Sequence, residues 1–162
     1  MTTVNTNAPS PSITRDLSPI CLSSSRSTDT STSITVKSAL GGMYKLQGGG
    51  AGSAFKLFEI TGSSEVTFMN LNIVNGSTYG GGAAISLFGS GQLTLVDVAF
   101  SKHCAIGEGG TISFYTIYDA DLVVTNCSFT DISATGAGGA ISATACKSRL
   151  QLFGPLSRAS CL

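Results

Sequence analysis

The residues whose types and spacing could do chemistry are few, and two carboxylates stand out among them. Asp119 and Asp121 lie two positions apart, close after Tyr115 and Tyr118. Glycoside hydrolysis uses two carboxyl groups at a set separation across a groove, and tyrosine rings can stack on sugar rings. The same carboxylates could instead bind calcium. The stretch is two residues longer than its counterpart after Ile85, and the simplest interpretation is a solvent-exposed loop tip, so the pair is a weak catalytic candidate.

The single histidine, His103, lies beside Cys104 and near Glu108. A Cys/His nucleophile requires the two side chains to face each other, with a third group that orients the base. Neighbours along a chain seldom face each other, so we interpret His103 as a histidine in a turn. The five cysteines are odd in number and form no C-x-x-C pair, so neither a zinc site nor a complete disulfide framework is indicated and no cofactor or metal is expected.

Composition excludes several classes of partner. The chain has 162 residues, with nine Lys and Arg against nine Asp and Glu, and only 11% of its residues are charged. Without a basic stripe there is no support for nucleic-acid binding. No apolar run reaches the roughly 18 residues of a membrane helix, and Met1–Ser33 shows no signal peptide.

The amino-acid composition and hydrophobic pattern change after residue 33. Residues 1–33 are rich in Ser, Thr and Pro and contain no glycine, which predicts a disordered or capping segment. Over residues 34–162, short segments in which apolar and polar residues alternate are separated by glycine-rich segments, which predicts strands of a few residues. We expect 34–162 to be one repeat domain, a fragment or incomplete at its C-terminus.

A fixed repeat organises the second part. Three glycine-rich motifs run into Ile85, Ile112 and Ile141, at steps of 27 and 29 residues. A more degenerate copy places Leu46 twelve residues before Phe58. The residues twelve positions before the three isoleucines are all large and apolar: Ile73, Phe100 and Phe129.

Each copy also carries a polar residue between its first two strands, namely Asn70, Asp97 or Asn126. Beyond it the inward parity of the apolar residues shifts by one, so we interpret this residue as a corner that does not alternate. The three side chains could form a hydrogen-bonded ladder. In such a ladder Asn126, which belongs to a glycosylation sequon, would be inaccessible.

The repeat predicts the fold. Identical motif order at a constant step stacks each strand parallel on its successor, with rungs about 4.8 Å apart. The prediction is an all-β, right-handed, single-stranded parallel β-helix (pectin-lyase-like solenoid) of about four to five rungs. The last rung, around Leu150–Phe153, is expected to offer an open edge for self-association of copies. A glycine turn before each isoleucine is expected to need positive φ or to crowd the neighbouring backbone; its structural glycines are Gly109, Gly110, Gly138 and Gly139.

Outward positions of the strands are expected to be polar. Ser86, Ser113 and Ser142 form one outward column whose hydroxyls suit a solvated flank. A regular threonine face would favour ice binding, but Val123 follows where Thr67 and Thr94 align, so the pattern does not support it.

The glycine motifs resemble a known family. Gly-Gly-Ala-Ile at 138–141 matches the Gly-Gly-Ala-(Ile/Leu/Val) motif, and residues 34–155 resemble chlamydial-type polymorphic membrane protein repeats. The companion motif Phe-x-x-Asn is not kept, because Gly76, His103 and Ile132 stand where it has Asn. The resemblance implies a β-helical passenger region of a cell-surface or secreted protein, used for adhesion or display.

The expected function is therefore a non-enzymatic, extracellular or outer-membrane-associated β-helix module for adhesion, display or structural assembly. Its expected partners are host or matrix surface molecules or glycans. The alternative is a carbohydrate-active polysaccharide lyase or hydrolase of the same fold, or a fragment of one, which would use Asp119 and Asp121. Because the sequence signatures of polygalacturonases and pectate lyases are missing, an enzyme is the minority interpretation.

Overall fold

The computed structural model describes residues 2–3, 13–14, 20–23, 33–38, 42–49 and 56–153. This part of the chain forms one sheet of 13 strands, in which every pair is parallel, and it contains no helix. The first six strands are β1 (Thr2–Thr3), β2 (Ile13–Thr14), β3 (Ile20–Ser23), β4 (Ser33–Lys37), β5 (Tyr44–Gln47) and β6 (Phe58–Thr61). The others are β7 (Glu65–Val74), β8 (Ser77–Thr78), β9 (Ile85–Phe88), β10 (Gln92–Ala105), β11 (Ile112–Thr125), β12 (Ser128–Ala134) and β13 (Ile141–Phe153).

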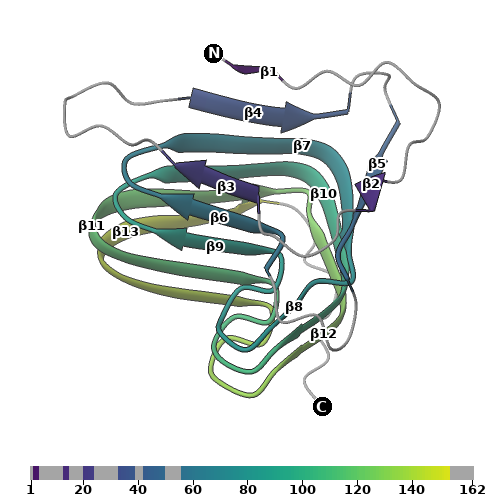
Figure 1. The fold of residues 1–162 in the computed structure, drawn as a ribbon. Coiled ribbons are helices and arrows are strands. Elements are labelled where there is room, and N and C mark those ends of the chain that lie inside the picture. Colours follow the sequence, from purple (N-terminus) through teal and green to yellow (C-terminus); the bar gives the residue numbers. More distant parts are fainter. Residues whose placement is uncertain are drawn as a thin grey trace.

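The strands wind as a solenoid, so the predicted parallel β-helix is confirmed. In Figure 1, β4, β7 and β10 lie one below another, while β3, β6 and β9 form a second row on the near side. Strand β10 passes from one row toward the next. On one side it pairs with β7 as far as Ser101 and then with β8, and on the other it pairs with β11 as far as Val96 and with β12 from Ala99.

The register confirms the columns of the sequence repeat. Ile112 pairs with Ile85 on one side and with Ile141 on the other. Leu46, in the degenerate copy, pairs with Ile73, and Phe58 pairs with Ile85. Equivalent side chains therefore lie one above another along the axis of the stack.

The core is a dry stack of these columns. Phe100 and Phe129 stack with their ring centroids 5.1 Å apart and an interplanar angle of 8°. Cys127 belongs to this core as a buried thiol, as the sequence predicts for an inward position. Because each rung covers the apolar edge of its neighbour, burial of this kind stabilises the stack only when several rungs are present.

The described parts of residues 1–33 are strands at the N-terminal end of the stack. Strand β1 pairs with β4, β2 with β5 and β3 with β6. Ile13 is level with Leu46, and Ile20 with Phe58, so both columns extend one level further than the sequence analysis placed them. The threonine column also extends this way, since Thr35 is level with Thr67.

Two corners shape each rung, and both use the left-handed backbone region. The φ angles are 54°, 54° and 50° for Asn70, Asp97 and Asn126. This left-handed conformation interrupts the alternation of inward and outward side chains, as predicted for the corner. The second corner, five residues later in each copy, was not foreseen. Its residues have φ of 58°, 58° and 53°, and they are Asn75, Lys102 and Asp131.

Candidate functional site

The two candidate carboxylates lie on a strand rather than in a loop. Both fall within β11, where Asp119 is level with Lys147 and Asp121 is level with Arg149. Strand β13 pairs with β11 before and after this stretch, with a register irregularity between Thr116 and Asp119, so the segment continues as a strand instead of forming the expected loop. The Asp121 side chain is half-buried, and the side chain of Asp119 lies outside the described part of the structure. Among the described residues, no three His, Cys, Asp or Glu side chains gather as a metal site.

His103 is buried inside the solenoid, with 1% of its surface exposed. The expectation of a turn histidine is therefore wrong: His103 lies in β10, one position after the left-handed Lys102, and that corner turns its side chain inward. Cys104, next along the strand, is exposed. The two side chains lie on opposite faces of the strand, which excludes a Cys/His pair.

Both ring nitrogens of His103 bond to the preceding rung. Nδ1 accepts a hydrogen bond from the backbone N–H of Gly76 at 3.0 Å. Since Nδ1 is an acceptor, Nε2 carries the proton and donates to the carbonyl of Ile73, also at 3.0 Å. Burial lowers the pKa of His103 to about 4, although the bond to Ile73 acts in the opposite direction. His103 is thus a neutral link between two rungs.

The hydrogen bond between Gly76 and His103 requires a residue without a side chain at position 76. A Cβ on Gly76 would lie 2.6 Å from His103 Nδ1 and would overlap the carbonyl oxygen of Ala83. Gly76, His103 and Ile132 occupy equivalent positions in successive rungs, the position that holds Asn in the Phe-x-x-Asn motif. In this chain a glycine and a histidine share one interaction there.

The corner residues make one side-chain contact between rungs. Asn126 Nδ2 donates to Asp97 Oδ1 at 2.5 Å. Asn126 is exposed, so the expectation that it would be inaccessible is wrong: the corner turns its side chain away from the core. The nearby Cys127 thiol has a raised pKa, chiefly because it is buried, and a buried protonated thiol is a poor nucleophile.

The glycine turn uses both of the mechanisms expected of it. Gly109 and Gly138 have φ of 67° and 73°, in the left-handed region. A Cβ on Gly109 would overlap the carbonyl oxygen of Ile112. Gly110 shows the second mechanism, because its N–H donates to the Gly139 carbonyl at 2.6 Å and a Cβ on it would overlap that same oxygen.

The row formed by β6, β9, β11 and β13 carries two outward columns. The register places four residues in each. The first column is Glu59, Ser86, Ser113 and Ser142, and the second is Thr61, Phe88, Tyr115 and Thr144.

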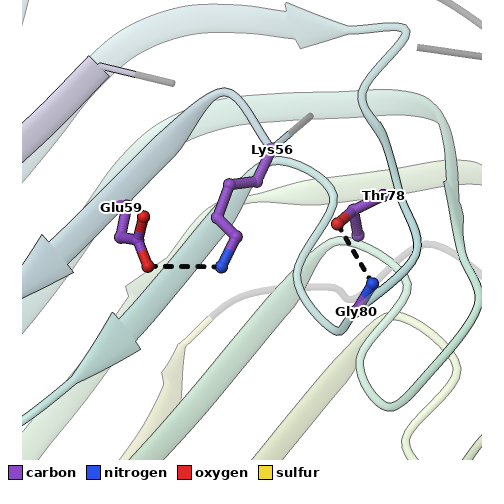
Figure 2. A network of polar contacts seen from close by, with 4 residues as sticks. All are labelled: Lys56, Glu59, Thr78 and Gly80. Atoms are coloured by element: carbon purple, nitrogen blue, oxygen red, sulfur yellow. Dashed lines mark hydrogen bonds and ion pairs between the residues drawn. The ribbon is translucent and has the colours of Figure 1, made fainter. Parts of the chain in front are cut away.

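The serine column is more covered than the sequence suggested. Ser142 is 8% exposed, and its hydroxyl donates to Glu108 Oε2 at 3.1 Å. Glu108 belongs to the glycine-rich turn that precedes β11, so this turn contacts the column at Ser142. At the other end Glu59 Oε1 pairs with Lys56 Nζ at 3.4 Å (Figure 2).

The second column contains an exposed aromatic pair, Phe88 and Tyr115. Their ring centroids are 5.4 Å apart with an interplanar angle of 9°. Phe88 is 56% exposed and Tyr115 is 44% exposed. Of these two residues, Tyr115 was a candidate from the sequence and Phe88 was not. The signal that could have found Phe88 is that each residue lies three positions after the isoleucine of its copy.

Comparison of the chain with protein-family models, curated proteins and solved structures finds no match in any of the three. In the described residues no helix has the length and apolar character to span a membrane.

Proposed function

We propose that this chain is a non-enzymatic β-helix module, secreted or displayed at a cell surface, that serves adhesion, display or structural assembly. The observation that carries the proposal is the stacking of outward side chains at fixed register, from Thr61 through Phe88 and Tyr115 to Thr144. A solenoid face of this kind places side chains at a regular spacing along one axis, which suits binding to extended partners.

The roles of the other polar residues agree with this proposal. Both ring nitrogens of His103 form hydrogen bonds with backbone groups of the preceding rung. Asn126 forms a hydrogen bond with Asp97 at a corner. These side chains stabilise the solenoid. The resemblance of the glycine motifs to polymorphic membrane protein repeats adds the cell-surface setting to the proposal.

Labelling of intact cells of the source organism tests the location. We expect an antibody against the chain to label intact cells or to detect the chain in the medium, and external protease to remove the cell-bound signal. Labelling that requires permeabilised cells would overturn the surface proposal.

A turnover assay tests the enzymatic alternative. With polygalacturonate, xylan or another polysaccharide, we expect neither unsaturated products in ultraviolet absorbance nor new reducing ends. Turnover that disappears in the Asp119→Asn and Asp121→Asn variants would replace the proposed module with a lyase or hydrolase.

A further inference from the structure

We propose that Phe88 and Tyr115 form a binding site for a neutral saccharide, which lays the apolar face of a pyranose ring against an aromatic ring. This inference rests on the proposed function and names the class of molecule that the module contacts. The pair is exposed: 56% of Phe88 and 44% of Tyr115 face solvent, and their neighbours in the column are Thr61 on one side and Thr144 on the other.

The geometry of the pair leaves two ring faces open. Because the rings are nearly parallel, at 9°, their inner faces are turned toward each other. The outer face of Phe88 is turned toward the level of Thr61, and that of Tyr115 toward the level of Thr144. A threonine side chain is shorter than an aromatic one, so the distal part of each outer face projects beyond its threonine neighbour.

Hydroxyl groups surround these open faces. Thr61 and Thr144 flank the rings along the column, and Ser86 and Ser113 precede them by two residues on the same strands. A pyranose ring combines an apolar C–H face with a rim of hydroxyls. Aromatic faces bordered by side-chain hydroxyls are complementary to both features.

The charges on this face favour an uncharged sugar. Glu59, at the head of the serine column, is already paired with Lys56 (Figure 2). Glu108 accepts from Ser142, and its carboxylate would repel an acidic glycan. The chain as a whole has no net charge, so its overall charge gives a polyanion no long-range attraction.

A second copy of the chain is a poorer occupant. A stable protein interface buries about 800 Å² per partner. The exposed halves of two aromatic side chains offer roughly 200 Å². The pair is therefore large enough for one or two sugar rings and too small for a stable dimer.

Affinity electrophoresis of the purified chain tests the proposal. The probes are hydroxyethyl cellulose, xylan and galactomannan cast into native gels, with polygalacturonate as the acidic probe. We expect retardation by at least one neutral polysaccharide. The Phe88→Thr and Tyr115→Thr variants, which place in the column the residue it already has at Thr61 and Thr144, should weaken the Kd about three- to tenfold each.

A matched control uses another exposed aromatic residue. Tyr79 is 70% exposed and lies in a turn closed by the Gly80 N–H and Thr78 Oγ1 at 3.2 Å (Figure 2). Tyr79→Thr should leave retardation unchanged. If an aromatic variant fails to fold by circular dichroism, saturation-transfer NMR on the unsubstituted chain decides instead, since magnetisation should pass from aromatic protons to the sugar C–H face.

Three outcomes would overturn the proposal: no retardation by any neutral probe, retardation by polygalacturonate alone, or unchanged retardation of both folded aromatic variants. None of these results bears on whether the chain reaches the cell surface, which the labelling experiment decides separately.

Discussion

His103 and Ile73, thirty residues apart in the sequence, are joined by a 3.0 Å hydrogen bond between the imidazole Nε2 and the backbone carbonyl. The same imidazole accepts from the Gly76 N–H through Nδ1, so one side chain satisfies a donor and an acceptor of the preceding rung. Only the neutral ring can do both, because protonation would turn Nδ1 into a second donor that faces the Gly76 N–H.

Acid should therefore weaken the fold through His103. Its pKa is about 4 in the folded chain and near 6.5 when unfolded, so the unfolded state binds the proton first. The contribution is complete above pH 6.5 and is lost as the pH falls toward 4, by at most about 3 kcal/mol. Urea unfolding at pH 7, 5.5 and 4 would measure it. A His103→Gln variant should show a smaller loss across this window, and equal losses in both proteins would contradict the assignment.

The left-handed glycines should be intolerant of a side chain. Gly109→Ala adds a Cβ at φ of 67° that overlaps the Ile112 carbonyl, and we expect it to cost about 2 kcal/mol or more in free energy of unfolding. The matched control is Gly42→Ala, where a Cβ meets nothing within 4 Å. Similar midpoints of chemical unfolding for the two variants would count against the turn geometry.

The stacked isoleucine column should be the main source of stability. Ile112 is fully buried between Ile85 and Ile141, so Ile112→Ala should lower the free energy of unfolding by about 2–5 kcal/mol. Ser113, the next residue, points outward and is half-buried, and Ser113→Ala should change the free energy of unfolding by less than about 0.5 kcal/mol. The comparison fails if the two alanine variants unfold at the same denaturant concentration.

The second corner offers a stabilising substitution. Lys102 is exposed and holds φ of 58°, a conformation that asparagine tolerates better than lysine. Asn75 occupies the equivalent position in the preceding rung. Lys102→Asn should raise the free energy of unfolding by about 0.5–1 kcal/mol, whereas Lys102→Ala should not. Thermal unfolding of the three proteins would show whether the gain follows the backbone preference.

The regular part of the fold could be predicted because its step is nearly constant. Ile85, Ile112 and Ile141 are separated by 27 and 29 residues, and a constant step in a solenoid means that equivalent residues stack. The first rung was not predicted, because the connections near the N-terminus differ in length from the later ones. Ile20 and Phe58 lie at the same level of adjacent rungs although they are 38 residues apart. Variable loops hide a register that strand pairing still keeps.

The orientation of His103 could not be predicted without the second corner. A left-handed residue inside a strand shifts the inward parity by one. The apolar pattern reveals this shift at Asp97, and no comparable pattern follows Lys102 to reveal the second one. The aromatic pair was only half foreseen for a different reason. Whether Phe88 is exposed depends on where the glycine-rich turn folds back, and that turn covers Ser142 while it leaves Phe88 and Tyr115 open.

The uniformly parallel pairing has a mechanical consequence. Hydrogen bonds between strands run along the axis of the stack, so each rung is held to the next by its own set of bonds. Tension between the two ends of the chain would load these sets one after another, and the solenoid would unwind from an end, coil by coil. Force applied across the axis would instead strain many bonds of a row together, which makes the molecule compliant in one direction and stiff in the other.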